Sequence, residues 1–191
     1  MTETELAFYY VPSGADAPPR LRFGLHDLVR AANLEFVPPL GFRGPMKDFA
    51  LEEAASAAAS AQVEAEPVKY LEQMDGQPAI LALDEDGTLL GFASFVENRD
   101  LSESLGVVAT IYLSTIIVGS NARRRGVAAK LYEALFRHAR TLDDAAIIVT
   151  RTWSTNASHI PLLGRLGFSV AKRLPDDRGP GVDTLYFRKD L

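Results

Sequence analysis

The hydrophobic pattern of the chain is strongest over residues 107–142. The run VVATIYLSTIIV at 107–118 is apolar and rich in β-branched residues, which predicts a buried strand. Turn-forming residues follow at 119–121, and then the basic residues Arg123–Arg125. From 127 to 142 the apolar positions recur at helical spacing, with lysine, glutamate and arginine on the other face. This stretch therefore predicts a strand, a tight basic turn and a helix.

The rest of the pattern predicts further elements around this unit. Strands are expected at 6–11, 79–83, 89–96, 145–152, 168–172 and 184–188, with a hairpin turn at 84–87 and a polar loop at 98–104. Helices are expected at 25–36, 46–66, 68–74 and 155–166, the last with Ser154 or Thr155 as N-cap and Gly167 at its end. We find no repeat or linker. The pattern predicts one α/β (α+β) domain over 1–191 with a mostly antiparallel sheet, whose parallel part is the central strand–helix–strand unit.

Composition narrows the class of protein. The 191 residues are 47% hydrophobic and 24% charged, as in an ordinary soluble globular protein. A net charge of −5 argues against general nucleic-acid binding, and the lack of cysteine excludes disulfides, thiolate metal sites and a cysteine nucleophile. No apolar run approaches the roughly 18 residues of a membrane span, and the acidic start is unlike a signal peptide. We expect a cytoplasmic protein without a metal, a nucleic-acid partner or a membrane.

The basic turn predicts an anion site. Arg123–Arg125 form the densest cluster of positive charge, directly before the start of the predicted helix. The free N–H groups and dipole of a helix N-terminus favour an anion, and Gly126 lets a ligand approach the backbone. No Gly-Lys-Ser/Thr follows Gly126, so a nucleotide-binding P-loop is disfavoured. We expect a phosphate or pyrophosphate here; the alternative is a solvated helix N-terminus without a ligand.

Two motifs together resemble those of the GNAT superfamily of acyl-CoA-dependent N-acyltransferases. Arg123-x-x-Gly126-x-Ala128 resembles the family's Q/R-x-x-G-x-G/A motif, and NASHIPLLGRLGF at 156–168 is similar to N-x-x-A-x-x-L-Y-x-K-x-G-F. The hairpin at 79–96 also resembles the family's second and third strands. The resemblance covers about 78–172, leaving an N-terminal part (1–77) and a C-terminal loop and strand (173–191). It implies a GNAT-like mixed sheet of about six to seven strands with helices on both faces.

The resemblance also implies a ligand and a reaction. It implies acetyl transfer from acetyl-CoA to a primary amine of a small molecule or peptide, by direct attack in a ternary complex. We expect a monomer or a homodimer. The pyrophosphate would lie on the backbone of 124–129, and the pantetheine arm would pair with the central strand where the family opens its sheet with a bulge. The expected cofactor-binding residues are Ile116, Ile117, Val118, Arg123, Arg124, Arg125, Gly126, Val127, Ala128, Ala129 and Asn156. For Asn156 the alternative is a helix N-cap.

The catalytic residues are less clearly implied, because Leu163 stands where the family usually has tyrosine and cannot donate a proton. Ser158 and His159 on the same helix and Tyr112 on the central strand are candidate acids, each with an alternative structural role. Glu97 is the candidate base, with a water chain or a plain surface position as alternatives. Two other functions stay open: a non-catalytic acyl-CoA-binding or sensing domain, which Leu163 makes reasonable, and an interaction module without a ligand.

Overall fold

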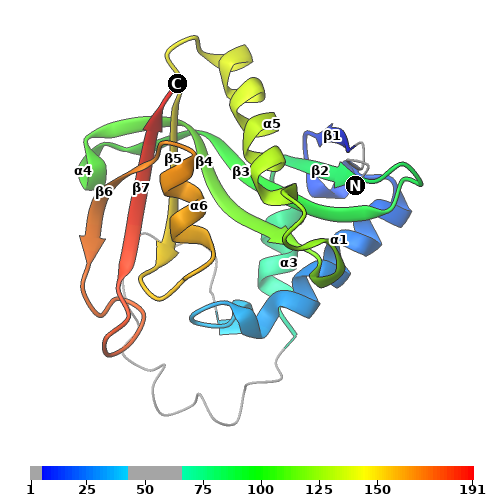
Figure 1. Cartoon of the computed structure of the whole chain (residues 1–191), viewed down its shortest axis with the longest axis horizontal. Helices are drawn as coiled ribbons and strands as arrows, with labels where there is room; N and C mark the ends of the chain where they lie inside the picture. Colours follow the sequence, from blue (N-terminus) through cyan, green and yellow to red (C-terminus); the bar gives the residue numbers. More distant parts are fainter. Residues whose placement is uncertain (1–5, 43–65) are drawn as a thin grey trace.

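The computed structural model describes residues 6–42 and 66–191, and there the chain forms a seven-stranded sheet (Figure 1). The strand order is β1-β2-β3-β4-β5-β7-β6, and only the β4–β5 pair is parallel. The predicted mixed sheet, with its parallel part at the central strand–helix–strand unit, is therefore confirmed. The strands are Ala7–Val11 (β1), Ala79–Leu83 (β2), Leu89–Leu101 (β3), Val107–Val118 (β4), Ile147–Trp153 (β5), Ser169–Leu174 (β6) and Thr184–Asp190 (β7).

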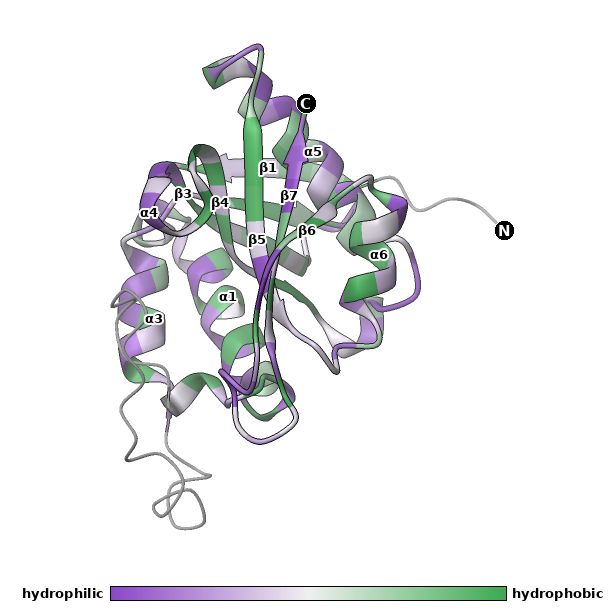
Figure 2. Ribbon diagram, turned by 90° about the vertical axis from the view of Figure 1, so that its left-hand side faces the viewer, coloured by the Kyte–Doolittle hydropathy of each residue, from purple (hydrophilic) through white to green (hydrophobic). Residues whose placement is uncertain are grey.

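Helices cover both faces of this sheet, as expected. The α-helices of the described residues are Pro19–Ala32 (α1), Val68–Asp75 (α3), Ser102–Leu105 (α4), Val127–Leu142 (α5) and His159–Arg165 (α6). Short 3₁₀ turns include Asn33–Glu35 (η2) after α1 and Ser120–Ala122 (η4) after β4. Figure 2 shows α1 and α3 on one side of the sheet and α6 on the other. No helix among the described residues is long and apolar enough to cross a membrane.

The two faces bury different cores. On one face, apolar residues of α5 and α6 such as Leu131, Leu135 and Leu163 pack on alternate residues of the central strands. On the other face, Leu25 and Val29 of α1 pack with α3 and with the intervening strand residues. The period-two alternation of the strands thus supplies an apolar surface to both helix layers.

Several predicted boundaries are corrected. Helix α1 begins at Pro19 rather than at 25, because proline suits the first turn of a helix and its missing N–H costs nothing there. The predicted loop at 98–104 is wrong, because β3 runs to Leu101 and α4 follows it directly. The polar residues at the end of β3 stay in the strand because they pair with the first residues of β4. Helix α6 begins at His159 rather than at 155. The predicted helix at 46–66 lies outside the described residues except for Glu66, which is not helical.

The sheet opens between its two parallel strands. Residues 111–113 of β4 pair with 148–150 of β5, and beyond that point the strands diverge (Figure 1). Strand β4 stays with β3 up to Val118, and β5 stays with β7 up to Trp153. A bulge opposite Ser94 and Phe95 leaves Ser114 unpaired where the split begins. The edge of residues 114–118 that faces β5 therefore has no strand partner in the described chain.

Candidate active site

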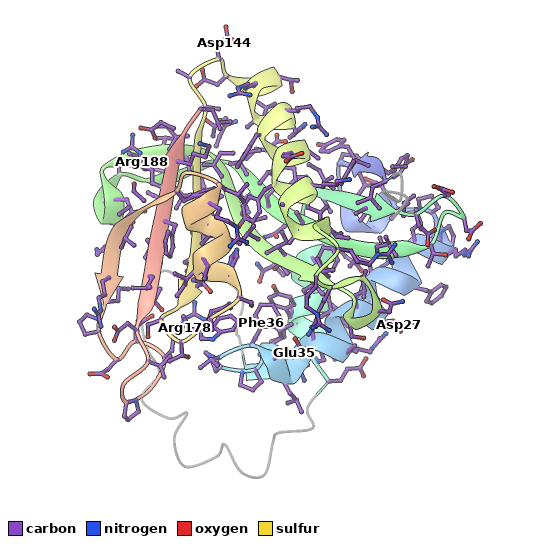
Figure 3. The ribbon with its side chains drawn as sticks, in the orientation of Figure 1. Asp27, Glu35, Phe36, Asp144, Arg178 and Arg188 are labelled. Atoms are coloured by element: carbon purple, nitrogen blue, oxygen red, sulfur yellow. The ribbon has the colours of Figure 1, made fainter. Side chains whose placement is uncertain are left out.

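A cavity of about 550 Å³ occupies the split between β4 and β5. Its walls come from the open ends of these two strands, from the N-terminal ends of α5 and α6, and from the end of α1 with η2. Figure 3 shows Glu35, Phe36 and Arg178 close together below the ends of β4, β5 and α6. The sequence predicted cofactor binding at two regions: the end of β4 with the start of α5, and the start of α6. The cavity connects both of them with a third region near the end of α1.

One end of the cavity is a turn that suits an anion. Arg124 and Gly126 have positive φ values of 61° and 79°, whereas Arg125 between them does not. Alternation of this kind points successive backbone N–H groups towards one place and forms an anion-binding nest. Helix α5 starts at Val127, and its N-cap residue Gly126 offers no side-chain hydrogen bond to the free N–H groups. A β-carbon on Gly126 would have no atom within 4 Å, so the space beside the turn is open.

Arg123 lies in the same turn but points away from it. Its Nε donates to the carbonyl oxygen of Val118 over 3.1 Å, and its Nη2 lies 2.8 Å from the carboxylate of Glu35. The side chain thus joins the end of β4 to η2. Ile116, Ile117 and Val118 all line the cavity, but the Val118 carbonyl is already engaged.

Asn156 caps helix α6. Its Oδ1 accepts hydrogen bonds from the His159 backbone N–H (3.1 Å) and from the Ser158 hydroxyl (3.0 Å), and its Nδ2 donates to Thr152 Oγ1 over 3.0 Å. This is the capping role that the sequence left open for Asn156, and it replaces the predicted cap at Ser154 or Thr155. Asn156, Ser158 and His159 all line the cavity, and Ser158 is exposed.

His159 connects the cavity to the core. Its Nε2 lies 2.8 Å from the hydroxyl oxygen of Tyr132, a fully buried residue of α5. Burial lowers the pKa of His159 to about 4, so the ring is neutral at physiological pH. Burial also raises the pKa of Tyr132 above its ordinary value, so its hydroxyl keeps its proton. His159 Nδ1 has no hydrogen-bond partner among the described residues.

Another part of the cavity wall mixes aromatic rings with cations. Phe36 and Trp153 face each other with ring centroids 5.6 Å apart, and the Arg178 guanidinium lies 5.9 Å above the Trp153 ring. Arg178 Nη1 also donates to the carbonyl of Val37, 2.5 Å away. Arg151 of β5 lines the cavity as well. This end could hold a small molecule with both apolar and anionic parts.

A polar cluster surrounds the bulge at the start of the split. Gln77 Oε1 accepts hydrogen bonds from the hydroxyls of Ser94 (3.0 Å) and Ser114 (2.6 Å), and the Ser114 hydroxyl also lies 2.9 Å from the Ser94 carbonyl. Beside it, the hydroxyls of Tyr70 and Thr115 are hydrogen-bonded to each other. Ser114 and Thr115 line the cavity. The cluster satisfies the backbone and side-chain groups that the bulge removes from the ladder.

Two candidate catalytic residues lie away from the cavity. Tyr112 is buried on the other side of β4, with Val149 and Tyr186. Glu97 lies on β3, and its Oε1 is 2.9 Å from Nε2 of His138 on α5. Neither belongs to the cavity lining. Leu163, at the position of the family's tyrosine, is completely buried in the core.

Several residues of the site have no counterpart among the sequence candidates, and three of them bear on its chemistry. Glu35 is the only carboxylate among the residues that line the cavity in the described chain, Arg151 lies one residue beyond the β4–β5 pairing, and Tyr132 supports His159. Tyr132 fits the apolar stripe of a helix, and Arg151 fits a polar strand position. Only the position of a charged residue, Arg151, within a predicted buried strand offered a signal.

Comparisons with known proteins point to one family. Residues 49–168 match the model of the acetyltransferase (GNAT) family. L-methionine sulfoximine/L-methionine sulfone acetyltransferases from Pseudomonas paraeruginosa and Pseudomonas aeruginosa are each 31% identical to the chain over 100 residues. These 100 residues are 52% of this chain and 55% of each relative, so the chain spans about half the length of these curated relatives.

Solved structures share the fold across nearly the whole chain. A GNAT-family protein from Desulfovibrio desulfuricans superposes with a TM-score of 0.62 at 16% identity, covering 97% of this chain and 99% of its own. A protein from Salmonella typhimurium, solved with its cofactor acetyl-CoA, gives 0.58 at 19% identity, covering 98% and 95%. Because the family model spans more than half of the sequence and the structures share its fold, the chain belongs to the acetyltransferase (GNAT) family.

Proposed function

We propose that this protein transfers an acetyl group from acetyl-CoA to a primary amine of a small molecule or peptide. The observation that carries the proposal is the single cavity that joins the nest at Arg124–Gly126 to the unpaired edge of β4. The names of the Pseudomonas relatives and the acetyl-CoA complex of the Salmonella protein support the same reaction.

The residues present fit acetyl-CoA. The backbone N–H groups at 124–129 suit a pyrophosphate, because the nest and the start of α5 both favour anions. The free edge of Ile116 and Ile117 suits the amide groups of a pantetheine arm, which would add to β4 like a further strand. When bound, the coenzyme supplies an acetyl thioester whose sulfur becomes negatively charged as it leaves.

His159 is the residue that we assign to this developing charge. We assign the Tyr132 hydroxyl as the donor to Nε2; the neutral imidazole then carries its proton on Nδ1, the ring nitrogen without a partner among the described residues. An N–H placed at the cavity wall stabilises negative charge without first becoming an imidazolium. Tyr132 is then a positioning residue that fixes the orientation and tautomer of His159.

Glu35 is the residue that we assign to the attacking amine. Among the lining residues of the described chain it alone carries a carboxylate, and Arg123 holds that carboxylate at the cavity wall. An amine must lose a proton before it can attack, and a carboxylate can orient the ammonium and accept that proton directly or through water. The hydroxyls of Ser114 and Thr115 at the bulge offer further acceptors.

The test is turnover by the full chain with acetyl-CoA and a panel of primary amines that includes L-methionine sulfoximine. Release of free thiol and formation of the acetylated amine are measured together. We expect both to rise with at least one amine of the panel. If CoA binds but no amine is acetylated, the protein is an acyl-CoA-binding or sensing domain, which the buried Leu163 favours. If CoA does not bind, both functions are refuted.

A further inference from the structure

Arg151 of β5 is half-buried in the cavity wall and has no acidic partner among the described residues. Its Nη1 donates to the hydroxyl of Tyr186 over 3.2 Å, which uses one of its five N–H donors. Within residues 6–42 and 66–191, no carboxylate lies within 4.0 Å of its guanidinium. By contrast, a carboxylate partner is present for each of Arg22, Arg30, Arg123, Arg173 and Arg188.

A guanidinium without a carboxylate partner in the protein can bind an anionic ligand. Removing an unpaired charge from water is unfavourable unless a counter-charge replaces the lost hydration. Asp177 acts on Arg151 only from beyond ion-pair distance, and its Oδ2 accepts a hydrogen bond from the Thr184 hydroxyl over 2.5 Å. The remaining donors of Arg151 are therefore available to a group in the cavity that it lines.

The position of Arg151 in the cavity indicates which anion it can bind. It follows Thr150, the last residue of β5 that pairs with β4, so it stands at the closed end of the split. Strand β4 ends at Val118, five residues beyond the last paired residue Leu113, and the nest at Arg124–Gly126 lies further along the chain. Arg151 also shares the sheet face of its cross-strand neighbour Tyr186, opposite to the face that α5 covers. An anion held by Arg151 is thus separate from one held at the nest.

We propose that Arg151 binds a carboxylate of the acceptor, and that the acceptor is an α-amino acid, whose carboxylate lies one carbon from its amine. This rests on the proposed acetyl transfer and names the substrate class of the same site. Arginine suits the role because its planar fork donates two parallel hydrogen bonds to a carboxylate. Trp153, two residues along β5 from Arg151, and Phe36, which contacts its ring, would pack against an apolar side chain of the amino acid.

The experiment compares two acceptors that differ only in the carboxylate: L-methionine sulfone and 3-(methylsulfonyl)propylamine, and likewise L-phenylalanine and phenethylamine. The ratio of kcat/KM for the amino acid to kcat/KM for the matching amine is measured for the wild type and for Arg151→Met. We expect the amino acid to be preferred by the wild type, and this ratio to fall about 50-fold in the variant. Arg151→Lys should recover part of the preference, since lysine keeps the charge but not the fork.

Arg165→Met is the matched control, because Arg165 also lines the cavity but lies on α6. It should leave the ratio unchanged, whatever happens to the absolute rates. Because the readout is a ratio of two substrates on one enzyme, partial loss of folded protein does not move it. Equal ratios in the wild type and Arg151→Met, or acetylation confined to amines without a carboxylate, would overturn the inference while leaving acetyl transfer intact. Absence of any acetylation would refute the proposed function itself.

Discussion

The imidazole of His159 on α6 and the hydroxyl of Tyr132 on α5 are hydrogen-bonded at 2.8 Å. The first residue lines the cavity and the second is completely buried, so a polar contact runs from the core to the site. Leu163 occupies the family's tyrosine position on the same helix as His159. Tyr132 therefore places a hydroxyl group beside α6, but from the neighbouring helix α5. This hydroxyl is connected to the cavity by its hydrogen bond with His159.

Removing this hydroxyl should impair catalysis more than binding. In Tyr132→Phe, His159 loses the partner that fixes its ring, so we expect kcat to fall about tenfold with little change in the KM for acetyl-CoA. The buried imidazole nitrogen left without a partner should also cost about 1–2 kcal/mol of unfolding free energy. Steady-state kinetics and urea denaturation measure the two effects. Tyr10→Phe, at a half-exposed tyrosine on β1, is the control and should change neither.

Filling the space beside the nest should abolish coenzyme binding. Gly126→Trp places a large side chain where a β-carbon meets no protein atom, so we expect the affinity for CoA in calorimetry to fall at least about 100-fold. Gly87→Trp is a close control, because Gly87 also has a positive φ (73°) and open space but lies in the β2–β3 hairpin turn. Both variants carry similar backbone strain. Retention of CoA affinity in Gly126→Trp would place the pyrophosphate elsewhere.

The lowered pKa of His159 predicts a specific acid sensitivity. Its pKa is about 4 in the folded protein against an ordinary value of 6.5, so between these values the unfolded chain binds a proton that the native state does not. The stabilisation is complete above pH 6.5 and is lost as the pH falls towards 4, by about 2–3 kcal/mol. Denaturant titrations of the wild type and His159→Gln across this range check it. The variant should show a shallower dependence, and identical slopes would contradict the assignment.

The polar cluster at the bulge should be sensitive to loss of its shared acceptor. Gln77→Leu removes the oxygen that accepts from Ser94 and Ser114, and Ser94 is completely buried. We expect a loss of about 1–3 kcal/mol in unfolding free energy, because a buried hydroxyl then lacks one of its partners. Gln73→Leu on α3 is the matched control, since no side-chain hydrogen bond of Gln73 is present among the described residues. If the two variants were equally stable, water would have taken the place of the Gln77 oxygen as hydrogen-bond acceptor, and the prediction would be wrong.

The sequence by itself determined the central unit of the fold, including the turn at Gly126. The apolar run at 107–118, the turn residues and the helical periodicity after Gly126 are local signals, and the observed strand β4 and helix α5 have the predicted bounds. Gly126 was also identifiable, because only glycine adopts a positive φ without strain. Local periodicity and backbone preference depend on neighbouring residues, so a sequence records them directly.

The tertiary structure alone decided which side chains share the cavity. Glu35 and Arg123 are 88 positions apart, and they meet because α1 packs on the face of the sheet beside the end of β4. Arg151 faces the cavity because the β4–β5 pairing stops at Thr150, a length that depends on the bulge at Ser114 and on the antiparallel partners of each strand. Periodicity shows which face of a strand or helix is buried. It does not show where two strands separate or which buried polar atoms meet across helices, because those depend on long-range packing.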